Sequence, residues 1–260
     1  MSTRLDFSPA AEPASRVRRI TSQARYETTL LLRNGEQTLL TIVIPLLVVV
    51  GLSTTTIIDL GAQAASYARI QTVAPSVLAL AILSSAFTAQ AIAVGFDRRY
   101  GVLTHLGTTP LGRPGLVLAK TLAISVIAFL QVILISVVAV ALGWRPTGSL
   151  LAAAGLMLLG MSAFSGLALL MAGTLRAEAT LAGANLIFLL LLVGGGTIIP
   201  TDQWPSGVAR IVEFLPTAAL ADGLRTILRD GALPTLSTWL VLVVWSAVGI
   251  TLASRFFRWD

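Results

Sequence analysis

The chain has 260 residues, of which 55% are hydrophobic and 12% are charged. Its mean hydropathy of +0.86 excludes an ordinary water-soluble domain, which carries about 25% charged residues. The absence of cysteine excludes disulfide bonds and thiolate metal sites, and the net charge of +6 indicates cytoplasmic loops rather than nucleic-acid binding, because the polar segments show no basic groove interleaved with aromatic residues.

The N-terminal region divides into a polar start and a basic helix. Residues 1–14 hold two prolines and few apolar side chains, so they are expected to be disordered and to contain no cleavable signal. Residues 15–36 are predicted to form an amphipathic helix in the headgroup layer of a membrane, with a solvated basic tail as the alternative. Residues with mainly apolar side chains recur at helical spacing, at Val17, Ile20, Ala24, Thr28 and Leu31. The cationic positions around them are Arg16, Arg18, Arg19, Arg25 and Arg33.

Six apolar segments follow, each close to the ~20 residues that a helix needs to cross a bilayer. They lie at about 38–58, 75–95, 119–142, 150–173, 179–199 and 236–254. The predicted fold class is therefore an all-α membrane protein with six transmembrane helices, formed by residues 37–260. An even number of spans places both termini on one side. Thirteen of the 18 basic residues fall on that side, which the positive-inside rule assigns to the cytoplasm.

Two features inside these segments predict local geometry. Pro45 lies within the first segment, where it removes a backbone hydrogen bond and permits a kink. Ser162 and Gly166 form a small-xxx-small pair in the fourth segment, which predicts the close approach of another helix.

The segment 200–235, between the fifth and sixth spans, is not an ordinary polar loop. Pro216 divides it into two amphipathic halves, and acidic and basic residues are interspersed among the apolar ones. Each half is too short and too charged to cross a membrane. We therefore predict a pair of re-entrant or interfacial helices at the outer face, because irregular backbone at membrane depth must be buried in protein or line water.

A polar segment at 96–114 separates the second and third apolar runs. Glycines and prolines punctuate it, and Val102, Leu103 and Leu106 give a short helix an apolar stripe. The segment is longer than the roughly 2–8 residues that join neighbouring helices of a bundle. Its length and its own apolar stripe indicate that it docks onto a partner protein.

Two stretches of the chain resemble ABC-2 type permeases, the membrane subunits of ATP-driven exporters. Residues 97–103 and 108–113 (DRRYGVL and TTPLGR) are similar to the family signature acid-Arg-x-x-Gly-Thr-Leu … Thr-Pro-Leu-Ser-Arg. Residues 215–225 (LPTAALADGLR), followed by Gly231, resemble the family's segment before its last span. With the basic helix and the six spans, the resemblance covers residues 15–258. The chain departs from the signature in having Asp97 in place of the commoner Glu, Val102 in place of Thr, and His105 where an acid is common.

The resemblance implies a role for each region. The N-terminal helix, with Arg16, Arg19, Ile20 and Arg25, and the first cytoplasmic loop would contact the ATPase, and the segment between spans five and six would form an extracellular gate. The implied coupling residues are Asp97, Arg98, Arg99, Gly101, Leu103, Leu106, Thr109, Pro110 and Arg113. The implied gate residues are Pro216, Asp222 and Arg225. The implied partners are two ATPase subunits and a second permease, which is either another copy or a paralogue, in a bacterial plasma membrane.

The chain has no nucleotide-binding motif of its own. The motif G-x-x-x-x-G-K-[ST] fails at Lys120, because Pro114 and Ala119 stand where its glycines are required. ATP and Mg²⁺ are therefore expected on a separate subunit, and no cofactor is expected in this chain. No catalytic residue is expected either, because His105 lies in a cytoplasmic loop and cannot reach the serines within the spans.

The sequence thus predicts an exporter subunit for a drug, an antibiotic or a lipid-like molecule. Its substrate cavity would lie between subunits, along spans one, two and five, with Ser84, Thr88, Gln90 and Asn185 as candidate lining residues. A membrane scaffold or sensor that anchors an ATPase complex is the alternative, and an intramembrane enzyme built on Ser165 is the third. The substrate and the choice between homodimer and heterodimer stay open.

Overall fold

The computed structural model describes residues 14–55, 68–197 and 205–258. The predicted disordered start, except for residue 14, lies outside this range, as do the distal end of the first predicted span and residues 200–204. The described residues form helices and no strand. The helices are α1 (Arg16–Arg33), α2 (Gly35–Thr54), α4 (Arg69–Leu83), η1 (Ser84–Ala89), α5 (Gln90–Arg99), α6 (Val102–Gly107), α7 (Gly112–Ala141), α8 (Leu150–Thr174), α9 (Ala177–Gly194), α10 (Ser206–Val212), α11 (Pro216–Leu228) and α12 (Leu236–Phe256).

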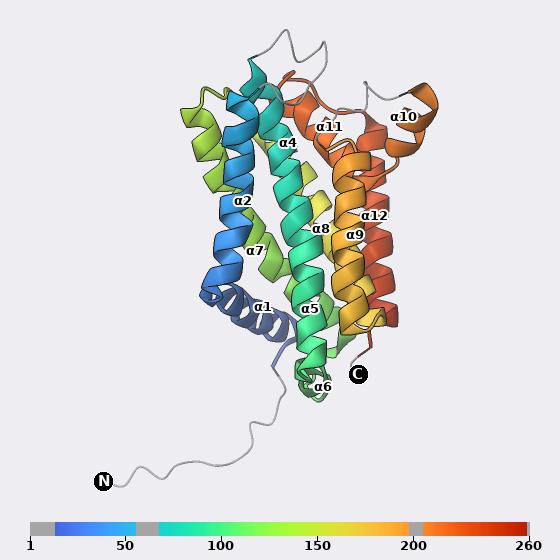
Figure 1. Cartoon of the computed structure of the whole chain (residues 1–260). Helices are drawn as coiled ribbons and strands as arrows, with labels where there is room; N and C mark the ends of the chain where they lie inside the picture. The colour runs from blue at the N-terminus through green and yellow to red at the C-terminus, as the bar shows by residue number, and fades with distance from the viewer. Residues whose placement is uncertain (1–13, 56–67, 198–204, 259–260) are drawn as a thin grey trace, which may run out of the picture.

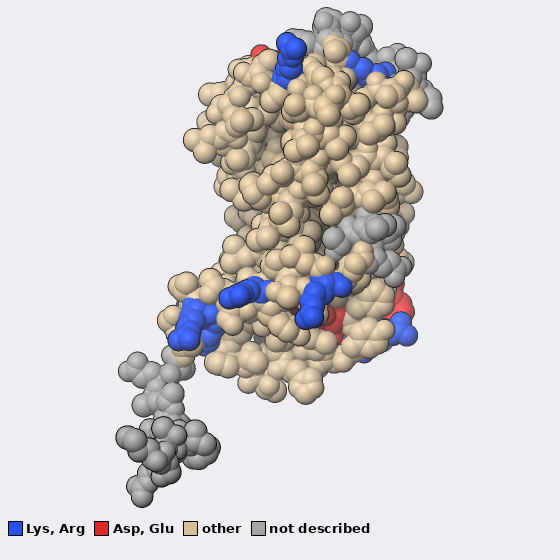
Figure 2. Space-filling view, turned by 90° about the vertical axis from the view of Figure 1, so that its left-hand side faces the viewer, with Lys and Arg blue, Asp and Glu red and all other residues tan. Residues whose placement is uncertain are grey.

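The long helices run side by side as a bundle (Figure 1). Helix α1 lies across one end of the bundle, and the short α6 projects from that end, which we name the α1 end. Helices α10 and α11 lie at the opposite end, which we name the α11 end. In Figure 2, Lys and Arg side chains gather at the two ends, and the visible surface between them is almost free of charge. This distribution fits a body whose middle lies in hydrocarbon.

Five helices are long and apolar enough to cross a membrane. They are the continuous helix Arg69–Arg99, which joins α4, η1 and α5, and the helices α7, α8, α9 and α12. These five overlap the second to sixth predicted spans. The first predicted span corresponds to α2, but its described apolar part, Ile42–Thr54, is shorter than the others. The structure therefore supports five spans among the described residues, and the count of six stays a prediction.

Two of these helices are longer than the apolar segments predicted. The second span continues through Arg98 and Arg99, and the third begins at Gly112 rather than at residue 119. Charged residues ended the predicted segments because they are costly in hydrocarbon. The backbone nevertheless stays helical through them, because a helix satisfies its own amide groups, and the charged side chains lie at the end of the bundle, where they are either paired or exposed.

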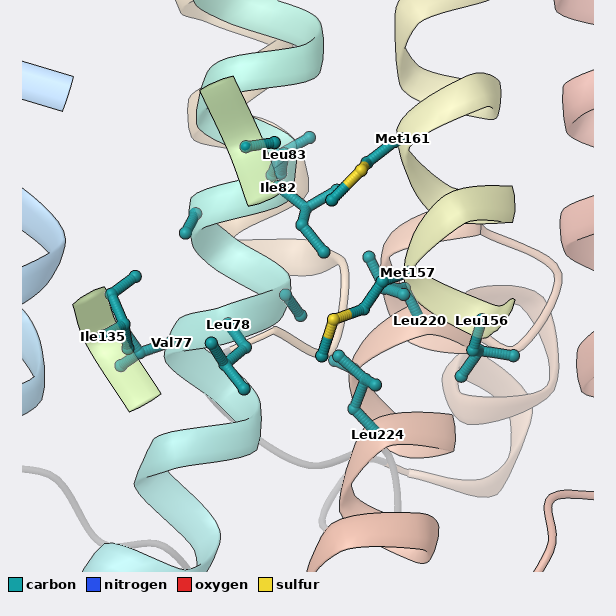
Figure 3. Packing of buried hydrophobic residues seen from close by; sticks show 14 of the residues in the cluster. Val77, Leu78, Ile82, Leu83, Ile135, Leu156, Met157, Met161, Leu220 and Leu224 are labelled. Atoms are coloured by element: carbon teal, nitrogen blue, oxygen red, sulfur yellow. The ribbon is translucent and has the colours of Figure 1, made fainter. Parts of the chain in front are cut away.

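The main hydrophobic core lies between α4, α7, α8 and α11. Figure 3 shows Met157 and Met161 pointing from α8 towards α4, while Leu220 and Leu224 enter from α11. Helix α11 begins at Pro216, the residue that was predicted to divide the segment, and packs on α4 and α8 with nearly every residue buried. Helix α10 instead stays mostly exposed. The two halves of the segment 200–235 are thus helical, but they differ in burial.

The predicted small-xxx-small contact is confirmed between α8 and α12. A Cβ atom on Gly166 would lie 2.7 Å from the backbone carbon of Gly249, so only glycine allows this approach. The Ser162 and Ser246 hydroxyls form a hydrogen bond of 2.5 Å between the same two helices. Small residues here allow dispersion contacts and an interhelical hydrogen bond at close range.

Candidate functional site

Helix α1 packs along α7 through one face. Ala24 and Glu27 are buried in this contact, and Ile20 is half-buried. Val17 belongs to the apolar series that the sequence predicted, yet it is 71% exposed. The predicted stripe therefore serves mainly to hold α1 on the bundle. The outward surface of α1 carries Arg16, Arg18 and Arg25 together with exposed apolar side chains.

A buried ionic cluster joins α1 to the bundle. The Lys120 Nζ atom, on α7, lies 2.8 Å from Oε1 of Glu27 on α1 and 2.7 Å from Oδ2 of Asp97 on α5. Lys120 is 5% exposed. The amide of Gln23 also donates to Oε1 of Glu27, at 3.0 Å. One ammonium group thus holds carboxylates from two other helices, and the cluster carries a formal charge of −1.

A second contact ties α1 to the loop that precedes α7. The guanidinium NH1 group of Arg19 donates to the backbone carbonyl of Pro110. A cavity of about 270 Å³ lies beside this contact, and both α1 and the loop line it. Its lining residues are Ala14, Arg18, Arg19, Ser22, Gln23, Thr109, Pro110 and Leu111. The predicted coupling residues Thr109 and Pro110 therefore lie directly against α1.

Helix α6 is anchored by one buried side chain. Gly101 precedes it with φ of +73°, a left-handed conformation that turns the chain back after α5. Leu103 is fully buried in a cluster with Leu116 and Phe257, and Leu106 packs at its edge. His105 and Val102 face outward. Helix α6 therefore cannot shift without moving the α5, α7 and α12 residues around Leu103.

The predicted coupling arginines divide into two groups. Arg98 turns towards the bundle, where its NH1 group donates to the carbonyl oxygens of Leu175, at 2.8 Å, and Ala172, at 3.3 Å. A cation at the carboxyl end of α8 complements the helix dipole. Arg99 and Arg113 are exposed. Arg98 thus holds α5 to α8, whereas the other two remain available at the surface.

The predicted gate residues all lie on α11, and two of them, Asp222 and Arg225, are in contact. Arg225 is 2% exposed, and its Nε donates to the Ser76 hydroxyl of α4 at 3.0 Å. Its NH1 and NH2 groups donate to the carbonyl oxygens of Gly196, at 3.0 Å, and Thr197, at 2.6 Å, just beyond α9. Asp222, one turn away on α11, accepts at 2.5 Å. One guanidinium therefore links α11, α4 and the end of α9, while Pro216 occupies the first turn of α11.

The four candidate cavity residues lie on two neighbouring helices. Ser84 and Thr88 belong to η1, a π-helical turn within the second span, and Gln90 follows it. Gln90 is 4% exposed, and its side-chain amide has no partner among the described residues. Asn185 is exposed on α9 and donates to the Leu181 carbonyl of its own helix at 2.9 Å. π-Helical turns interrupt the regular backbone and are frequent at functional sites.

Glu27 and Lys120 were not identified as site residues from the sequence. In the sequence, Lys120 fits the cytoplasmic excess of basic residues and fails the nucleotide-binding motif, and Glu27 is a lone acid within the basic helix α1. Two signals pointed to them: Lys120 is the one lysine of the chain and is followed by a long apolar run, and Glu27 is an acid surrounded by arginines and apolar residues. A charged side chain beside a membrane span is unfavourable unless it is paired with an opposite charge, so Lys120 and Glu27 are each expected to have a partner.

Residues 19–228 match the family model of the ABC-2 type transporter. The match begins within α1 and ends at the last residue of α11, so it includes the ionic cluster, the α6 loop and the Arg225 contacts. No curated protein sequence matches the chain. The matched domain is the membrane component of such transporters and is distinct from their ATPase.

Proposed function

Since the chain belongs to the ABC-2 type transporter family and is a multi-pass permease subunit of an ABC transporter, we propose that it exports an amphipathic or hydrophobic substrate across a bacterial plasma membrane. Two separate ATPase subunits bind ATP and Mg²⁺ and supply the energy, and this chain carries no cofactor. Two permeases pair, as two copies or as paralogues. The α1 end, with both termini, faces the cytoplasm, and α2 completes six spans.

The ionic cluster is the observation that carries this proposal. Lys120 joins α1 to α5 and α7, the two helices that flank the α6 loop. A displacement of α6 would therefore move α1, α5 and α7 together. Interactions among buried charges depend steeply on geometry, so the cluster favours movement of these helices as one body over separate small shifts.

The exposed surface around α6 is suited to hold the ATPase. Phe96 and Tyr100 stack with ring centroids 6.1 Å apart and are both exposed, as are Arg99, which lies between them in the chain, and Arg113 at the start of α7. Aromatic and arginine side chains are enriched at protein interfaces. Asp97 and Leu103 then act from behind this surface, where they fix it to the bundle.

At the opposite end, the Arg225 contacts serve as the outer gate in this proposal. They join α4, α11 and the end of α9 without a covalent link, so a relative movement of these helices can break and reform them. Substrate would pass between the two permeases along α2, η1, α5 and α9, past the partly exposed Ser84 and Thr88 and the exposed Asn185.

The test is co-purification of the full chain with the ATPase subunit encoded next to its gene. We expect a complex that hydrolyses ATP and, in proteoliposomes, moves a fluorescent phospholipid in an ATP-dependent manner. The double variant Arg99→Ala/Arg113→Ala should lose most of the bound ATPase. Its matched control, Arg145→Ala/Arg210→Ala, removes two exposed arginines from the α11 end and should retain it.

Two outcomes would contradict the proposal. Undiminished ATPase binding by Arg99→Ala/Arg113→Ala would place the motor elsewhere on the protein. A complex that hydrolyses ATP but moves neither the phospholipid nor ethidium would favour the membrane scaffold.

A further inference from the structure

A cavity of about 330 Å³ lies between α7 and α8, and none of the residues that line it belongs to α1, α6 or the Arg225 contacts. Residues of α7 and α8 form its walls, Leu78 of α4 and Leu228 of α11 close its inner side, and Trp144 borders it just beyond α7. Figure 3 shows Met157, one of its lining residues, pointing from α8 towards Leu78. The lining is apolar apart from the Ser136 hydroxyl and the Trp144 indole, so the cavity suits a hydrocarbon chain.

The cavity opens on the outer surface of the bundle. Phe129 of α7 and Leu150 and Leu158 of α8 line it, yet these side chains are 59%, 65% and 59% exposed. Both helices are long and apolar enough to cross a membrane. Because the chain is a membrane protein, the surroundings of this opening are lipid tails rather than water.

The length of the cavity matches one leaflet. Its α8 lining runs from Leu150 to Met161, which corresponds to about 16 Å along a helix axis at 1.5 Å per residue. This is about half of the ~30 Å hydrocarbon core. The cavity is therefore long enough to accommodate a single acyl chain from the headgroup region at the α11 end towards the bilayer centre.

One polar group in the cavity wall lacks a partner. Trp144 is 4% exposed, and its indole Nε1 donates to no acceptor among the described residues. A buried N–H group without an acceptor is unfavourable, and water would need more polar partners than this site supplies. A hydrogen-bond acceptor on a bound lipid would satisfy the indole N–H group of Trp144. Tryptophan is also enriched at the membrane depth where the acyl chains meet the headgroups.

We propose that this cavity binds one acyl chain of a membrane phospholipid, with the Trp144 indole donating a hydrogen bond to an ester carbonyl of that lipid. The inference requires only that the chain lies in a membrane, and it is independent of the transport direction and of the ATPase. Met157 and Met161 supply adaptable side chains that adjust to a flexible tail.

The test uses the full chain in nanodiscs that contain a phosphatidylcholine with a diazirine group midway along one acyl chain. After illumination, peptide mapping should find the label concentrated in residues 129–144 and 150–161. Ala154→Phe places a bulky side chain at an exposed position of the lining and should abolish this excess labelling. The control Ala141→Phe adds the same bulk at an exposed position of α7 outside the cavity and should leave the labelling unchanged.

A second comparison tests the hydrogen bond. Wild-type protein should be labelled more strongly by the ester-linked probe than by an ether-linked probe that lacks carbonyls. Trp144→Phe keeps an aromatic ring but removes the N–H group, so this preference should disappear while the site of labelling stays the same.

Three results would overturn the inference. Label spread evenly over the exposed faces of α7, α8, α9 and α12 would mean ordinary annular lipid. Unchanged labelling in Ala154→Phe would place the lipid outside the cavity. A benzophenone at position 158 that cross-links two copies of the chain would show that a second copy covers the opening instead.

Discussion

The two ends of the bundle each bury one cation, and they satisfy it differently. At the α1 end, Lys120 lies between the carboxylates of Glu27 and Asp97, which belong to two other helices. At the α11 end, Arg225 contacts the carboxylate of Asp222 on its own helix. It also donates to a hydroxyl and to two backbone carbonyls. One end therefore concentrates charge, and the other distributes hydrogen bonds.

The chemistry of the two side chains suits these arrangements. An ammonium group is a compact point charge that depends on full counter-charges, whereas a planar guanidinium directs several donors at fixed angles. Loss of Lys120 would leave two carboxylates whose side chains are only 11% and 20% exposed, whereas loss of Arg225 would leave neutral carbonyls and a carboxylate that is 32% exposed. The comparison predicts that the α1 end is more sensitive to a single substitution than the α11 end.

The largest effect is expected from Lys120→Met. It leaves Glu27 and Asp97 without a cation although both lie within 2.8 Å of the same nitrogen, with side chains only 11% and 20% exposed. Removing one partner from a buried ion pair costs about 3–5 kcal/mol. Thermal unfolding in detergent, followed by size-exclusion chromatography, should show a strongly lowered apparent Tm.

The control for this prediction removes all three charges. The triple variant Glu27→Gln/Lys120→Met/Asp97→Asn has no unpaired ion, so it should recover most of the lost Tm. If the triple variant is as unstable as Lys120→Met, then helix packing and not uncompensated charge explains the loss.

The next effect is expected from Arg225→Met at the α11 end. The substitution removes the donors to Ser76, Gly196 and Thr197, and hydrogen bonds to charged groups contribute about 1.5–3 kcal/mol. We expect a loss of about 2–3 kcal/mol, because Asp222 can be hydrated and carbonyl groups tolerate partial desolvation better than charges do. The same unfolding assay checks it. A lower Tm than that of Lys120→Met would reverse the proposed ranking of the two ends.

Much of the helical framework could be predicted from the sequence. Apolar runs of about 20 residues located five long helices because backbone groups in hydrocarbon must bond within their own helix. Gly166 predicted a close helix contact, and Pro216 predicted the division of the segment 200–235 into two halves, because both residues act through local geometry. The ends of the spans were less accurate, since a partnered charge such as Asp97 does not stop a helix.

The contacts at both ends could not be predicted in the same way. Glu27 and Lys120 are 93 residues apart, and their pairing depends on how α1 crosses α7. The burial of α11 could not be predicted either, because an amphipathic pattern does not distinguish a helix on a membrane surface from one that is inserted among other helices. Arg98 illustrates both limits: the positive-inside rule explains its side of the membrane but not its contact with α8.

Glu27→Gln tests how much the Glu27 carboxylate contributes to holding α1 on the bundle at the α1 end. Lys120 keeps Asp97, so no charge is left unpaired, and we expect a stability loss of only about 1.5 kcal/mol for a weakened charged hydrogen bond. The attachment of α1 should loosen more than the bundle does. Limited proteolysis should cut between α1 and α2 faster than in wild type, and Gln23→Ala, which removes only a neutral donor to the same carboxylate, provides the milder reference. Equal cleavage of wild type and Glu27→Gln would show that α1 is held by its apolar face alone.

The smallest effect on stability is expected from a matched pair of glycine substitutions, one at each end. Gly101 and Gly231 have φ angles of +73° and +72°, and no atom approaches closer than 3.5 Å to a Cβ built on either. Each Gly→Ala substitution should therefore cost about 1 kcal/mol through backbone strain alone. Their functional effects should differ, because Gly101 sets the angle between α5 and α6, whereas Gly231 lies beyond α11, away from the α6 surface. With the ATPase bound, Gly101→Ala should reduce ATP-dependent lipid movement per ATP hydrolysed, and Gly231→Ala should not. If both variants lower this ratio equally, then the turn at Gly101 has no special part in passing movement from α6 to the bundle.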